Sequence, residues 1–117
     1  MILVQSPGSL DATFAALSDP TRRAILARLA MGEATVSQLA EPLPISQPAV
    51  SRHIRVLAEA GLVVQRIDGA RRPCRLAPGG LSELDDYLQM LRTGLERNYQ
   101  RLDRLLSASR KRKGNPA

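Results

Sequence analysis

The sequence predicts a mostly α-helical domain that carries one small β-hairpin, and three observations lead to this fold class. Apolar residues recur at helical spacing in several stretches, and each stretch opens with a residue that favours helix capping. After Gly61 the pattern changes to a short run with a period of two, closed by the turn Asp68-Gly69-Ala70. Aromatic residues make up only 3% of the 117 residues, so the core must be aliphatic and small.

Capping residues mark the first two helices. Ser9 is placed to cap a short helix, and Asp19-Pro20 starts the next one. Aspartate is a favoured N-cap, and the missing N–H of proline costs nothing in the first turn. Gly32 then ends the second helix.

Two further helices are joined by a short turn. Thr35 caps the first, which must end near Pro42-Leu43-Pro44, and Ser46 caps the second, over residues 46–60. In this second helix Val50, Ile54 and Leu57 are expected to point inward, and Gly61 is expected to end it. A second helix with polar residues at its exposed start is typical of a helix-turn-helix.

A wing and a long helix follow. Residues 62–67 and 74–76 are predicted strands around the turn at 68–70, which makes a two-stranded wing over about residues 66–75. Pro78-Gly79-Gly80 breaks the chain before a helix that runs from about Leu81 to Ser107. The predicted fold is a winged helix-turn-helix with about five helices.

The charge of the chain points to an anionic partner. Seventeen Lys and Arg against 11 Asp and Glu give a formal charge of +6. Six arginines and only two acids lie between Arg52 and Arg75. A polyanion such as DNA fits this charge, although a membrane surface or an acidic protein satisfies it too.

Other function classes are excluded by what the chain lacks. With one cysteine, Cys74, there is no internal disulfide, and no apolar run reaches the length of a membrane span, so we expect a cytoplasmic protein. The chain has a single histidine, His53. We interpret it as a packed or hydrogen-bonded helix residue rather than as a metal ligand. We find no nucleophile–base pair and no metal cage, and therefore expect no enzyme activity and no cofactor.

Two separated motifs resemble the ArsR/SmtB family of bacterial repressors. One is Ser46-Gln47-Pro48-Ala49-Val50-Ser51-Arg52-His53-Ile54, followed by Leu57 and residues 59–63; the other is residues 16–26, which resembles the second-helix signature of that family. The likeness covers roughly residues 12–106 and is closest to the branch often encoded beside START-like (AHSA1-type) proteins. It implies a homodimeric winged helix that binds an operator and blocks transcription, often of its own gene.

The metal sites of the family do not carry over. Its arsenic and cadmium sensors hold a Cys-x-Cys in the third helix, where this chain has Thr35 and Ser37. Its zinc sensors place histidine and acidic ligands on the last helix, and the predicted helix 81–107 has no histidine. Soft and borderline metals need thiolate or imidazole ligands, so we expect no metal site. Redox control, a small molecule or no effector at all stay open, and we favour an autorepressor without an inducer.

Candidate DNA-binding residues lie at helix starts and on the wing. Arg52 is the expected reader of a guanine edge, a bidentate contact worth roughly 1–3 kcal/mol of discrimination. The wing arginines are expected in the minor groove or on its phosphates, although a solvated turn is the alternative. The full set is Thr35, Ser46, Gln47, Pro48, Ala49, Ser51, Arg52, Arg71 and Arg72.

The long helix carries a heptad seam. Its members alternate at spacings of three and four and predict a dimer interface, although the seam could instead fold back on its own domain. They are Leu81, Leu84, Leu88, Leu91, Leu95, Asn98, Leu102 and Leu105. A two-fold dimer predicts a near-palindromic operator with half-sites roughly 34–36 Å apart.

The expected organisation is therefore a flexible arm over 1–8, a DNA-binding region over 9–80, a dimerisation helix over 81–107 and a basic disordered tail over 108–117. Cys74 is either an inert buried residue or a redox site whose thiolate is favoured by Arg72 and Arg75. The alternative function is a winged helix that only dimerises or docks a protein partner. The concentration of arginines argues against it, because such a surface has no need of a basic stripe.

Overall fold

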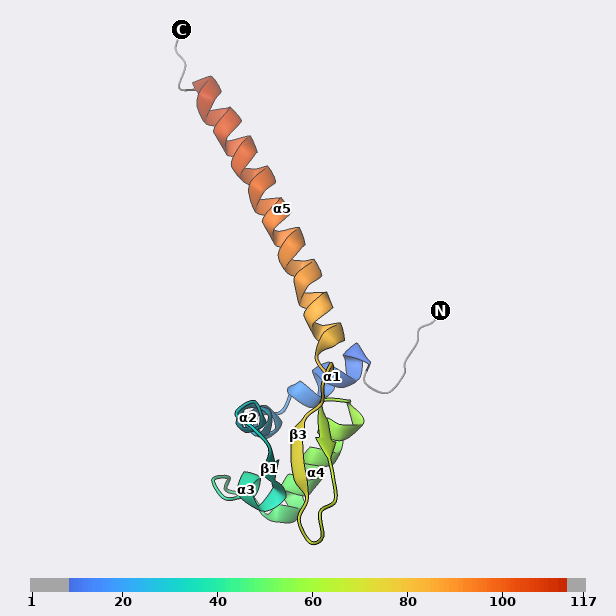
Figure 1. The fold of residues 1–117 in the computed structure, drawn as a ribbon. Helices are drawn as coiled ribbons and strands as arrows, with labels where there is room; N and C mark the ends of the chain where they lie inside the picture. Colours follow the sequence, from blue (N-terminus) through green and yellow to red (C-terminus); the bar gives the residue numbers. More distant parts are fainter. Residues whose placement is uncertain (1–8, 114–117) are drawn as a thin grey trace. The chain divides into compact units, whose positions relative to one another are not determined.

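The computed structural model describes residues 9–113 (Figure 1). The chain divides into two compact units after Leu84. Among the described residues, the first unit holds four helices and three short strands, and the second consists of the greater part of one long helix. The elements are, in chain order, α1 (Leu10–Leu17), α2 (Pro20–Leu29), β1 (Ala34–Thr35), α3 (Val36–Ala40), α4 (Gln47–Glu59), β2 (Val63–Gln65), β3 (Pro73–Leu76) and α5 (Ser82–Lys113).

All four predicted helix caps are confirmed. The side chains of Ser9, Asp19, Thr35 and Ser46 each accept a hydrogen bond from the backbone N–H three residues further on. In the case of Asp19 the N–H of Arg22 donates, and this bond lowers the pKa of the carboxyl below its ordinary value of 3.8. These caps satisfy N–H groups that a helix leaves without partners in its first turn.

Gly61 ends α4, as the sequence predicts. It adopts a φ of 80°, and its N–H and that of Leu62 donate to the carbonyl oxygens of Ala58 and Leu57. This pair of bonds is a Schellman motif, which glycine favours because it has no Cβ. The chain reverses here and enters β2.

The sheet has three strands in the order β1-β3-β2, all antiparallel neighbours, rather than the two strands of the predicted wing. Ala34 of β1 and Gln65 of β2 both lie opposite Cys74 on the central strand β3. The predicted strand 62–67 is shorter than expected, because the ladder stops at Gln65 and residues 66–72 are exposed.

The core lies between the helices and this sheet. Val50, Ile54 and Leu57 of α4 are at most 1% exposed, which confirms their predicted inward face. They pack with buried aliphatic residues of α2, α3, the bend after α4 and the sheet, including Ile25, Leu29, Leu39, Leu62 and Val63. Packing on α4 therefore fixes which of its faces is left to solvent.

The helix α5 runs further than the sequence predicts. The predicted disorder from residue 108 is wrong up to Lys113, because the helix continues to that residue. Alanine, arginine and lysine are good helix formers, and basic groups near a helix C-terminus are favoured by its dipole. The predicted arm over 1–8 and the last four residues of the predicted tail lie outside the described residues. Within residues 9–113, no helix is both long and apolar enough to cross a membrane.

Candidate nucleic-acid interface

Side-chain caps fix the starts of both α3 and α4. Thr35 and Gln38 form a capping box. Oγ1 of Thr35 accepts from the Gln38 N–H at 3.2 Å, and Oε1 of Gln38 accepts from the Thr35 N–H at 2.8 Å. Ser46 Oγ accepts from the Ala49 N–H at 3.3 Å. The first turn of α4 begins in solvent, since Ser46 and Gln47 are exposed. A free helix start of this kind suits the major groove, which is about 12 Å wide.

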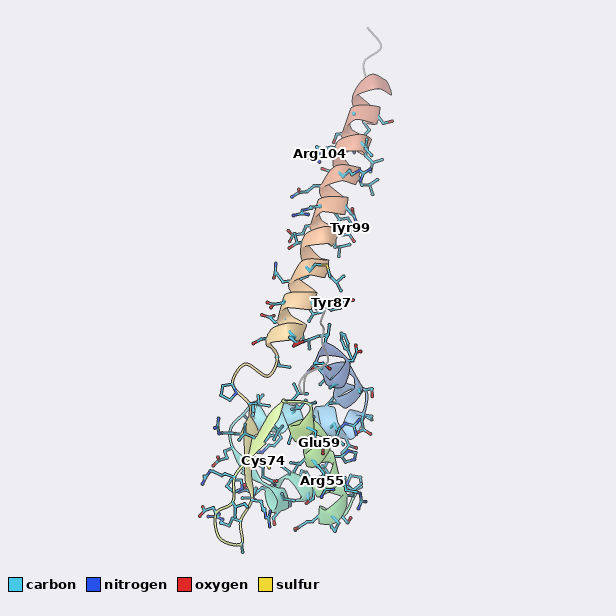
Figure 2. The ribbon with its side chains drawn as sticks, turned by 90° about the vertical axis from the view of Figure 1, so that its right-hand side faces the viewer. Arg55, Glu59, Cys74, Tyr87, Tyr99 and Arg104 are labelled. Atoms are coloured by element: carbon cyan, nitrogen blue, oxygen red, sulfur yellow. The ribbon has the colours of Figure 1, made fainter. Side chains whose placement is uncertain are left out.

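One exposed face of α4 carries polar side chains at intervals of four residues. Gln47, Ser51 and Arg55 share this face because residues four apart lie above one another on a helix. Arg55 can be followed in Figure 2. Together these side chains offer amide, hydroxyl and guanidinium groups, which are the groups that read base edges.

The wing closes a cleft beside this face. Asp68 and Arg71 exchange backbone hydrogen bonds of 3.1 and 2.9 Å around Gly69, whose φ of 62° permits the tight turn. The cleft has a volume of about 740 Å³ and lies between α3, α4 and the wing. Its polar lining residues are Thr35, Ser37, Gln38, Gln47, Ser51, Arg55, Gln65, Arg71 and Arg72.

The cleft brings together five of the nine predicted DNA-binding residues, namely Thr35, Gln47, Ser51, Arg71 and Arg72. The other four do not line it: Ser46, Pro48 and Arg52 are exposed on other sides of α4, and Ala49 is half-buried.

Sequence reasoning missed Arg55, Ser37, Gln38 and Gln65 among the cleft residues. For Arg55 the signal was present, because it continues the four-residue spacing of Gln47 and Ser51. The residues of α3 and β2 had no such signal, since only the folded wing brings them to the cleft.

Several other arginines stabilise the fold instead. Arg22 donates to the carbonyl oxygens of Ala16 at 2.7 Å and Ala15 at 3.1 Å, and Arg23 donates to that of Leu17 at 2.7 Å. These carbonyls end α1, where cationic side chains are favourable partners. Arg22 and Arg23 therefore bind the end of α1.

Arg66 lies in an ion pair. Its guanidinium is 3.0 Å from the carboxylate of Glu33 and 3.8 Å from that of Asp68. The hydrogen bond with Glu33 and its charge raise the pKa of Arg66. This side chain is therefore held by acids.

The side chains of His53 and Cys74 both form contacts within the fold. Nη1 of Arg22 is 3.3 Å from Nδ1 of His53, and since a guanidinium only donates, Nδ1 accepts. Cys74 is fully buried, its thiol 3.5 Å from the Arg72 carbonyl oxygen and 3.7 Å from Gln65 Nε2. Burial raises the pKa of the thiol, which favours the interpretation of Cys74 as an inert buried residue over a thiolate beside the arginines. Cys74 and Arg55 are labelled in Figure 2.

Thr35 stands where the metal-sensing members of the resembled family have a thiolate, and in this chain it has a structural role. Thr35 uses its hydroxyl to cap α3, and Ser37 is exposed in the first turn of that helix. The described part of the chain contains no group of three or more His, Cys, Asp or Glu side chains that could hold a metal ion.

A helix-turn-helix with an exposed second helix and a basic hairpin beside it defines a winged helix-turn-helix protein, a class that binds double-stranded DNA. Comparison with known proteins agrees, since a family model described as a helix-turn-helix domain matches residues 17–66. The HTH-type transcriptional regulator Rv2034 of Mycobacterium tuberculosis is 47% identical over 93 residues, which cover 80% of this chain and 80% of that protein.

Two further relatives agree. The transcriptional repressor SdpR of Bacillus subtilis is 41% identical over 54 residues, 46% of this chain and 60% of that protein. The crystal structure of the ArsR family transcriptional regulator RHA00566 superposes with a TM-score of 0.71 at 35% identity, covering 80% of this chain and 97% of that one. The chain belongs to the ArsR family of helix-turn-helix transcriptional regulators.

Proposed function

We propose that this chain is a homodimeric repressor in the bacterial cytoplasm that binds a near-palindromic operator, and that the operator lies upstream of its own gene. α4 enters the major groove, and the wing lies on the adjacent minor groove or backbone. Its action on transcription is by occupancy of DNA and involves no catalysis.

The cleft between α4 and the wing is the observation that carries this proposal. Gln47, Ser51 and Arg55 face the same space as Arg71 and Arg72. A base-reading face and a pair of cations for phosphates are thereby held in one concave surface, as a duplex requires. Arg52 does not line this cleft, but we assign it to the same interface because it is exposed on another side of α4.

The predicted seam on α5 supports the dimer. Six of its leucines (Leu81, Leu88, Leu91, Leu95, Leu102 and Leu105) are between 38% and 61% exposed in the single chain. Leu84 is half-buried and Asn98 is exposed. A second copy of α5 would cover this stripe, and each buried leucine contributes roughly 1.5–3 kcal/mol.

We also propose that the chain belongs to the branch of the family without the known metal sites, often encoded beside START-like proteins. Thr35 and Ser37 replace the thiolates, and the Thr35 hydroxyl is engaged in the cap of α3. An autorepressor that needs no inducer is the simplest regulator consistent with these residues.

Removal of the wing cations tests the function. Purified protein would be titrated against a fluorescent duplex, recovered from a random-sequence pool by selection on the wild-type chain. We expect R71A/R72A to weaken binding to every duplex similarly and to reduce the salt slope by about 0.9 for each phosphate that the variant no longer neutralises. By contrast, R55A should relax base preference at one position, at a cost of roughly 1–3 kcal/mol.

The matched control is R97A/R104A, which removes the same charge from exposed positions of α5 outside the seam. This variant should bind as the wild type does. Equal weakening in both double variants would mean that only net charge matters and would contradict a DNA site at the cleft. A pool with no enriched duplex would favour the protein-docking alternative.

A further inference from the structure

Glu33 and Arg66 lie on the same face of the sheet, on opposite sides of its central strand. Glu33 directly precedes β1 and Arg66 directly follows β2, and both strands pair with β3. Ala34 and Gln65 both stand opposite Cys74. Ala34, Cys74 and Gln65 therefore share one face of the sheet. Because successive side chains alternate between faces, Glu33 and Arg66, which are next to Ala34 and Gln65, share the other face. The ion pair therefore crosses β3 diagonally.

The contact is bidentate. Nη2 of Arg66 lies 3.0 Å from Oε1 of Glu33, and Nε lies 3.4 Å from Oε2. The remaining nitrogen, Nη1, is 3.8 Å from Oδ2 of Asp68. A bidentate guanidinium–carboxylate pair has a more defined geometry than a single contact, even at a surface where the side chains are 56% and 40% exposed.

Few other contacts tie the loop of the wing, residues 66–72, to the domain. Residues 64–72 are exposed, so apolar packing does not hold the loop. Its backbone is held by the Arg66 N–H on the Pro73 oxygen at 3.0 Å, by the bonds between Asp68 and Arg71, and by the Cys74 thiol on the Arg72 oxygen at 3.5 Å. Glu33, Arg66, Asp68 and Arg71 line one small hollow, so the ion pair lies beside the wing arginine that faces the cleft.

We propose that Glu33 is a positioning residue for DNA binding, which acts through Arg66 to hold the wing so that Arg71 and Arg72 face α4. The inference rests on the DNA interface proposed above. It makes a prediction opposite in sign to simple electrostatics, because an acid near phosphates should weaken binding and its removal should strengthen it. A positioning role requires that removal of Glu33 weakens binding.

The test is a double-mutant cycle on the selected duplex, measured by fluorescence anisotropy. We expect E33Q to weaken binding by up to about fivefold per half-site, the range of an exposed ion pair. In the background of R66Q, E33Q should no longer weaken binding, because Glu33 positions the wing only through that side chain; like E41Q, it should leave binding equal or slightly tighter. Tighter binding of E33Q than of the wild type would overturn the proposal.

The matched control is E41Q, which removes one exposed acid from the end of α3 without touching the wing. It should bind equally or slightly more tightly than the wild type. Hydrogen exchange supplies a second readout: in E33Q the Arg66 and Arg71 amides should exchange faster, while those of α4 stay protected. Unchanged wing exchange would overturn the proposal. A wild-type chain that selects no duplex would refute the proposed function itself.

Discussion

Gly80 is the residue whose replacement tests the packing of the domain most sharply. A Cβ at this position would lie 2.5 Å from the Gly61 oxygen, 3.2 Å from the Ala77 oxygen and 3.2 Å from the Leu62 Cα. All three are backbone atoms, so no side chain can rotate away. Gly61 and Leu62 are fixed by the Schellman motif that ends α4. We therefore expect G80A to cost roughly 1–3 kcal/mol, as overpacking in a filled core does.

Urea unfolding at one fixed protein concentration measures this cost. A decrease of about 2 kcal/mol in the unfolding free energy lowers the midpoint by about 1 M. The control is G94A, because a Cβ at Gly94 meets no atom within 4 Å in the single chain. In mid-helix that change favours the helix by up to about 1 kcal/mol. A G80A protein with the wild-type midpoint would refute this close packing around Gly80.

Three further variants test the cap, the ionised N-cap and the seam. S46A removes the oxygen that accepts from the Ala49 N–H and should lower the unfolding free energy by about 1 kcal/mol in urea. D19N keeps a capping oxygen but cannot ionise. Because the pKa of Asp19 in the folded state is below 3.8, the wild type should lose its stability advantage over D19N as the pH falls through 3.8 and below. Thermal unfolding of both proteins at pH 7 and pH 3 measures this. L95D places a charge in the seam and should give a monomer in sedimentation velocity, with weaker DNA binding; a dimer of unchanged stability would exclude the seam as the interface.

Most of the helical fold follows from local signals. The four caps, the end of α4 at Gly61 and the inward face of α4 depend on residues within a few positions of one another, and each is confirmed. Strand β1 has only two residues, and its pairing of Ala34 with Cys74 joins parts of the chain far apart in sequence. No periodicity can indicate so short a strand. The helical end of α5 was not predictable from composition, because basic residues are common both in helices and in disordered tails.

The candidate site was predictable only in part. Helix position placed Gln47 and Ser51, and composition indicated Arg71 and Arg72, all of which line the cleft. The sequence did not distinguish arginines with an acid partner from those without, since Glu33 reaches Arg66 only through the fold of the sheet. Likewise, the sequence left both an inert and a redox-active Cys74 open, and only the fold shows the burial that raises the pKa of its thiol.

The most direct test of the central claim is a comparison of two duplexes of equal length by fluorescence anisotropy over a series of salt concentrations. One duplex carries the DNA directly upstream of the gene for this chain, and the other carries the same bases in scrambled order. A sequence-specific autorepressor should bind the native duplex more tightly by about 10³ or more, with a steep dependence on salt. Equal and weak binding of both duplexes would contradict a sequence-specific autorepressor.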